Sequence, residues 1–225
     1  MADGARGSTT WLGVWLPAAM PRSRTRPARA LARRVQSDAE AAVAHVRRVE
    51  AVAAGGLTAQ DIDRTYAGAF LDFHARYERA LEALFVGLLA GDYVSPRPGV
   101  RRLVAVSTRE RALRVIEAGR PYADWLPFRH VLDRAELFFH KGRPFSEVGS
   151  AERNVLESAV ILRNLIAHNS RHAHQRFRRQ VIAGRPLPPS QRNGPGYLRG
   201  AHSGAETRFE FLVGELVTLM YGLCA

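Results

Sequence analysis

Three polar side chains, Arg163, Asn164 and His168, lie close together in an otherwise apolar segment of the chain. A helix turns by about 100° per residue, so Asn164 and His168 would share one face, with Arg163 within reach of both. A guanidinium can hold a phosphate through two of its oxygens, and an imidazole can transfer protons near neutral pH. These three residues therefore predict a site that binds and cleaves a phosphodiester.

RNA suits this chemistry because its 2'-OH can attack the neighbouring phosphate while the 5'-oxygen leaves. The ends would be a 2',3'-cyclic phosphate and a 5'-hydroxyl, and neither a metal nor another cofactor is needed. His168 would transfer the proton, and this contribution accelerates a reaction by roughly 100- to 10,000-fold. Arg163 would stabilise the charge that develops on the phosphate, and Asn164 would orient His168 or a phosphate oxygen. One histidine cannot easily act as base and acid together, so we expect a homodimer with its active site at the interface.

A basic tract follows these residues directly. The net charge of the chain is +12, and there is no acidic residue between positions 171 and 199. The arginines of this tract are Arg171, Arg176, Arg178, Arg179, Arg185, Arg192 and Arg199. We expect RNA to bind along its first part, through Arg171, Arg176, Arg178 and Arg179. A plain solvated surface is an equal alternative, because arginine is the usual basic residue of this chain.

The composition predicts one domain in a reducing compartment. The chain has 225 residues, of which 46% are hydrophobic, and this is enough to bury one core of ordinary size. Its one cysteine, Cys224, excludes an internal disulfide, which fits a cytoplasmic location. The apolar patch at 11–20 is short and contains Pro17, so it is a poor signal peptide. No transmembrane segment and no membrane partner are expected.

Helical periodicity and capping patterns predict an all-α fold, a bundle of roughly five to seven helices. Residues 1–36 mix glycine, proline, serine and arginine, so they are expected to form a disordered basic segment before a helical domain at 37–225. Either Met1 or Met20 could be the true start. Residues 184–200, rich in proline and glycine, are expected to be irregular. The expected helices are 37–54, 58–91, 108–118, 128–140, 150–168, 170–182 and a last one that begins at the capping box Ser203–Glu206.

The segment Leu162-Arg163-Asn164-Leu165-Ile166-Ala167-His168-Asn169-Ser170 resembles the Arg-Asn-x-x-x-His signature of the HEPN superfamily. The segments 124–128, 134–139 and 142–146 are similar to its RiboL-PSP-HEPN branch, so the resemblance spans about residues 58–222. It implies an HEPN-like helical bundle and a metal-independent endoribonuclease, usually dimeric. It also implies a role in toxin or antiviral defence systems, with a possible antitoxin protein as partner. Toxins of this kind that are regulated by a nucleotidyltransferase have a tyrosine where this chain has Ser170, which argues against regulation by tyrosine modification.

Several interpretations compete with a nuclease. The main alternative is a non-catalytic HEPN module that binds RNA or a partner protein. In a purely structural interpretation, His168 packs near the carbonyls that end its helix and Arg163 pairs with Glu157 or another carboxylate. His168, His172 and His174 lack a nearby cysteine or aspartate, so no metal site is expected. A DNA-binding regulator is the least favoured, because the basic helix at 170–182 has no partner helix and tight turn before it.

Overall fold

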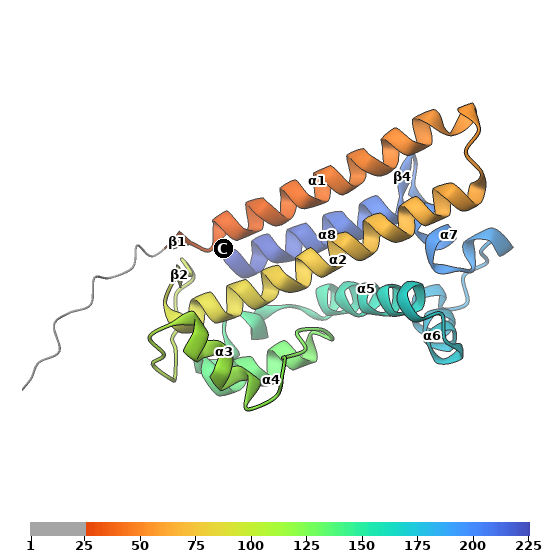
Figure 1. Ribbon diagram of the computed structural model, residues 1–225. Coiled ribbons are helices and arrows are strands. Elements are labelled where there is room, and N and C mark those ends of the chain that lie inside the picture. The colour runs from red at the N-terminus through yellow and green to blue at the C-terminus, as the bar shows by residue number, and fades with distance from the viewer. Residues whose placement is uncertain (1–25) are drawn as a thin grey trace, which may run out of the picture.

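A bundle of long helices forms the body of the protein. The computed structural model describes residues 26–225, and the predictions for residues 1–25, including the choice of start, lie outside that range. Figure 1 shows that three long helices run side by side, and each of the three contacts the other two. These helices are α1 (Arg29–Val52), α2 (Ala59–Ala90) and α8 (Arg208–Cys224), and α5 (Ser150–His168) packs against α2 and α8. The all-α prediction is confirmed.

Shorter elements lie at the two ends of the bundle. At one end are α3 (Arg109–Glu117) and α4 (Arg129–Phe138), and at the other are α6 (Arg171–Arg176) and α7 (Gly194–Arg199) (Figure 1). The remaining helical segments of residues 26–225 are short: η1 (Ala53–Gly55), η2 (His140–Gly142), η3 (Phe145–Glu147), the π-helical η4 (Phe177–Ile182) and η5 (Pro189–Gln191). The strand pairs are β1 (Arg26–Pro27) with β2 (Tyr93–Val94), parallel, and β3 (Ala201–Ser203) with β4 (Glu206–Thr207), antiparallel. Within residues 26–225, none of the helices combines the length and the apolar composition that a membrane span requires.

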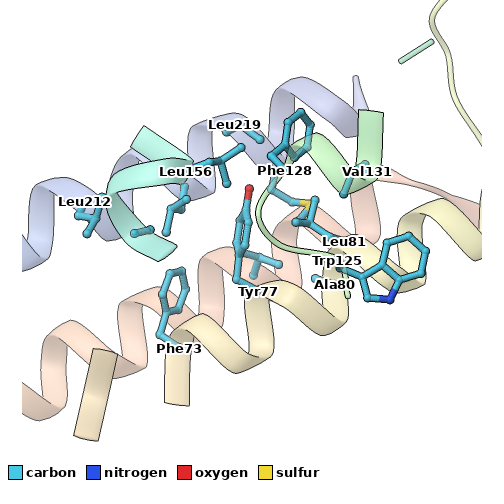
Figure 2. Close-up of a cluster of buried hydrophobic side chains, with 14 of the residues drawn as sticks. Phe73, Tyr77, Ala80, Leu81, Trp125, Phe128, Val131, Leu156, Leu212 and Leu219 are labelled. Atoms are coloured by element: carbon cyan, nitrogen blue, oxygen red, sulfur yellow. The ribbon is translucent and has the colours of Figure 1, made fainter. Parts of the chain in front are cut away.

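The central element of the core is α2. It begins with a capping box in which the Thr58 hydroxyl accepts the Asp61 N–H and the Asp61 carboxylate accepts the Thr58 N–H. From Tyr66 to Leu84 its buried side chains follow the helical spacing that the sequence predicts, and from Leu84 to Leu89 every residue is buried. Figure 2 shows Phe73 and Tyr77 of α2 lying in a cluster with Leu156 of α5 and with Leu212 and Leu219 of α8. Burying side chains of this size stabilises the fold by about 1.5–3 kcal/mol each, and this cluster fixes α5 against the bundle.

The first helix begins earlier than the sequence indicates. It starts at Arg29 and not at the predicted capping box of Ser37, so the helical domain extends upstream of residue 37, and residues 29–36 are helical and not disordered. The cause is burial, because Leu31, Ala32 and Val35 have a helical spacing and face the core. No side chain caps this helix start. Contacts with α2 and α8 outweigh the arginine-rich, disorder-like composition.

The prediction that residues 184–200 are irregular is wrong for their second half. Asn193 caps α7 by accepting the Gly196 N–H at 2.8 Å, and Pro195 lies in its first turn, where a missing N–H costs nothing. α7 contacts α2, α5 and α8. Gly196 is needed where α7 packs against η5, because a Cβ atom there would lie 1.9 Å from the Ser190 carbonyl oxygen. Proline and glycine therefore shape a short packed helix here.

The last helix uses a different capping box from the predicted one. Ser203–Glu206 forms a tight hairpin between β3 and β4, with Gly204 at a φ of 56°. The capping box belongs to Thr207 and Glu210, whose side chain and backbone groups bond reciprocally, and α8 begins at Arg208. The apolar period starts only at Phe209, which decides between the two similar patterns.

Candidate active site

The predicted site lies at the C-terminal end of α5. This helix spans Ser150–His168, as the sequence predicts, and its apolar face is buried. Arg163 and Asn164 are half-buried at the edge of that face, while His168, the last residue of the helix, is exposed. Asn169 ends the helix in the left-handed conformation with a φ of 45°, and its N–H donates to the Leu165 carbonyl at 3.0 Å. The three polar side chains therefore lie where core and solvent meet.

Arg163 contacts both of its predicted partners. Its Nη1 donates to the Asn164 Oδ1 at 3.1 Å and lies 3.2 Å from the His168 Nε2. A guanidinium has only donors, so the second contact is a hydrogen bond only when Nε2 carries no proton. The structural interpretation pairs Arg163 with Glu157 or another carboxylate, but Glu157 pairs with Arg176. No acidic side chain within residues 26–225 forms an ion pair with Arg163.

A buried histidine on α2 also belongs to this neighbourhood. His74 is 3% exposed, and its Nε2 has no hydrogen-bond partner among the described residues. Burial, and next the positive charge of Arg163, lowers the pKa of His74 to about 4, so this imidazole is neutral at neutral pH. This residue is not among those predicted from the sequence. Its signal is a histidine one helical turn from Phe70 and Tyr77, at a position in the apolar stripe of α2.

A cavity of about 330 Å³ opens where α5 meets α6. Its lining residues are Ile161, Asn164 and His168 from α5 with Ser170, His172, Ala173 and Arg176 from the chain that follows. Ser170 caps α6 by accepting the Ala173 N–H at 3.2 Å. This volume is at the lower end of the range for small-ligand sites, about 300–1,000 Å³. The cavity therefore brings two of the three predicted catalytic residues against a new set of polar groups.

The four predicted RNA-binding arginines fall into two groups. Arg176 lines the cavity, and Glu157 compensates its charge through an ion pair. Arg171, Arg178 and Arg179 are exposed, and none forms an ion pair with another described residue. Farther along the tract, Arg199 pairs with Asp63 of α2 at 3.4 Å. The structure thus leaves Arg171, Arg178 and Arg179 available to an anionic partner.

The described residues hold no group of three His, Cys, Asp or Glu side chains that could bind a metal ion. The three histidines near the site have different surroundings. His168 faces Arg163, His172 lines the cavity, and His174 lies with its Nε2 at 2.7 Å from the Asn169 Oδ1. What these side chains can do together is position a phosphate and move protons.

Comparisons of this chain with models of protein families, with curated proteins and with solved structures found no match.

Proposed function

We propose that this protein is an endoribonuclease that cleaves RNA without a metal ion, through Arg163, Asn164 and His168. One observation carries the proposal: a single guanidinium nitrogen of Arg163 contacts Asn164 at 3.1 Å and His168 at 3.2 Å. The latter two residues line a cavity at an exposed helix end. A phosphate-binding group and a proton-transferring group are thereby next to each other, as the attack of a 2'-OH on its phosphate requires.

The contact between Arg163 and His168 suits the first step of the reaction. While Arg163 donates to it, the His168 Nε2 has no proton and can act as a base. A phosphate oxygen that takes over the guanidinium donor frees this nitrogen to accept the proton of the 2'-OH. Arg163 then stabilises the additional negative charge on the phosphorus oxygens, and Asn164 holds the orientation of the guanidinium.

The resemblance of segment 162–170 to the HEPN signature supports the same reaction, and it makes a toxin or antiviral defence effector the proposed biological role. An antitoxin protein would then be a partner. Ser170, which replaces the tyrosine of nucleotidyltransferase-regulated toxins, caps α6 with its hydroxyl. That position therefore has a structural use in this chain, and regulation by a modified tyrosine is not part of the proposal.

The test is cleavage of a single-stranded RNA and of total tRNA by the full chain in EDTA, followed by end-group analysis. The wild type should leave 2',3'-cyclic phosphate and 5'-hydroxyl ends and should not cut DNA. His168→Ala removes the base and should lower kcat by roughly 100-fold or more. Arg163→Lys keeps the charge but loses the planar fork, and should lower kcat by a similar factor.

His45, exposed on α1, provides the control, and His45→Ala should cut RNA like the wild type. RNA that is bound but never cut, at any protein concentration, would replace this proposal by the non-catalytic binding module. Cleavage that disappears on addition of EDTA would overturn the metal-independent mechanism.

A further inference from the structure

The reaction needs a proton donor for the leaving 5'-oxygen, and the cavity beside His168 holds a second imidazole. His172, from the first turn of α6, lines the same 330 Å³ cavity as His168 and Asn164. It is exposed, and it forms no hydrogen bond or ion pair with another residue of 26–225. Its ring is therefore free to face a substrate in the cavity.

The turn between α5 and α6 brings this histidine to the site. Asn169 turns the backbone with a φ of 45°, and Ser170 caps the new helix. A side-chain contact between Asn169 and His174, 2.7 Å from Oδ1 to Nε2, links the two sides of this turn. Of the two histidines on α6, His174 thus stabilises the turn, and His172 lines the cavity.

We infer that His172 is the general acid of the proposed nuclease and that it acts within the same chain as His168. This inference rests on the proposed function. The two imidazoles have surroundings that suit opposite roles: Arg163 donates to His168 and so requires an unprotonated nitrogen there, whereas no described donor is directed at His172. Glu157 forms an ion pair with Arg176, the arginine that lines the cavity, and offsets its charge.

In the proposed step, the 2'-OH of the substrate gives its proton to the His168 Nε2 as the bond from the 2'-oxygen to phosphorus forms. The bond from phosphorus to the 5'-oxygen breaks, and the imidazolium of His172 gives its proton to that oxygen. The products are the 2',3'-cyclic phosphate and the 5'-hydroxyl end, and both histidines return to their starting states by exchange with water. One chain then supplies base and acid, and catalysis does not depend on a partner subunit.

The decisive substrate is an RNA oligonucleotide with one cleavage site at which sulfur replaces the 5'-oxygen. A thiolate leaves without a proton, so this substrate does not need the general acid. His172→Ala and His172→Gln should be slower than the wild type by roughly 100-fold or more on the oxygen substrate. On the sulfur substrate, both should approach the wild-type rate, whereas His168→Ala should be slow on both.

His174→Ala is the matched control, because His174 contacts Asn169 in the turn between α5 and α6 and does not line the cavity. Any loss that it causes should be the same on both substrates. Wild-type activity of the His172 variants on the oxygen substrate would overturn the inference, and so would an equal loss on both substrates. In either case the His168-dependent cleavage would still stand. Absence of cleavage by the wild type would instead refute the proposed function itself.

Co-expression of His168→Ala chains with His172→Ala chains tests whether both histidines act from one chain. If each active site belongs to a single chain, the mixed protein should stay as inactive as the separate variants. Recovery of about a quarter or more of the wild-type rate would mean that acid and base come from different subunits, and would overturn the same-chain assignment.

Discussion

At the scale of single residues, His74 makes stability depend on pH. Its pKa, about 4, lies below the value of 6.5 for an unperturbed histidine. As pH falls below 6.5, the unfolded chain takes up a proton that the folded chain does not, so the free energy of unfolding falls. This group alone should account for a loss of about 1.4 kcal/mol per pH unit until the folded pKa is reached. His74→Leu should remove that part of the slope, as measured by urea unfolding at a series of pH values.

His45→Gln is the control for this experiment, because His45 is exposed on α1 and its loss should leave the slope unchanged. A slope that is the same in His74→Leu and in the wild type would mean that the buried imidazole already takes up its proton in the folded state. At neutral pH, His74→Leu should be at least as stable as the wild type, because it removes a buried nitrogen without a partner.

The sequence predicts the candidate site only where the positions are linked by one regular helix. Arg163, Asn164 and His168 meet because α5 is helical throughout, so helical spacing alone was sufficient. The place of His172 depends on a left-handed residue at 169, and the place of His74 depends on how α2 packs against α5. The first is a backbone conformation that helical periodicity does not specify, and the second is a tertiary contact. The position of His74 in the apolar stripe of α2 therefore indicates its burial but not its neighbour Arg163.

At the scale of elements, the start of α8 shows which of two similar sequence patterns, Ser203–Glu206 or Thr207–Glu210, forms the capping box. Thr207 caps the helix through the Glu210 N–H, and Glu210 also pairs with Arg47 of α1 at 2.6 Å. Thr207→Ala should therefore lower the free energy of unfolding by about 1 kcal/mol. Ser203→Ala removes the hydroxyl of the other pattern and should change stability by less than about 0.5 kcal/mol. Thermal and chemical unfolding of both variants measures the difference, and equal effects would contradict the assigned helix start.

Helix boundaries could be predicted where a local signal fixes them. Thr58 and Thr108 cap α2 and α3 with their side chains, and both helices begin where the sequence indicates. α1 has no side-chain cap, and its start is set by burial of Leu31 and Val35 against distant helices. α7 has a local signal in its Asn193 cap, but proline and glycine in its sequence also suggest a loop, and its contacts with α2, α5 and α8 decide in favour of the helix.

At the scale of the whole molecule, the net charge of +12 should make RNA binding strongly dependent on salt. If RNA follows the exposed arginines of η4, the double variant Arg178→Gln, Arg179→Gln removes two phosphate contacts. The slope of log K against log salt should then become shallower by about 1.4, as expected for single-stranded RNA. Fluorescence anisotropy between about 50 and 200 mM salt, in the His168→Ala background, measures binding without cleavage.

The variant Arg33→Gln, Arg48→Gln is matched in charge and lies on α1, where both arginines are exposed. This control should keep the wild-type slope if RNA binds only along the predicted arginines at 171–179. The same change of slope in both double variants would mean that RNA is attracted by the total charge of the molecule and not by the arginines at 171–179.

The short segment 93–95 contacts both ends of the described chain. Arg26 pairs with Tyr93 in the β1–β2 ladder, and the Ser95 hydroxyl donates to the backbone oxygen of Ala225 at 3.4 Å. Figure 1 shows the C-terminus beside the first turn of α1. Residues 26 and 225 could therefore be joined by a short linker and the chain reopened at the exposed turn 55–57, a circular permutant that leaves every α-helix whole. In that permutant α1 would follow α8 along the chain, as it already adjoins α8 in space.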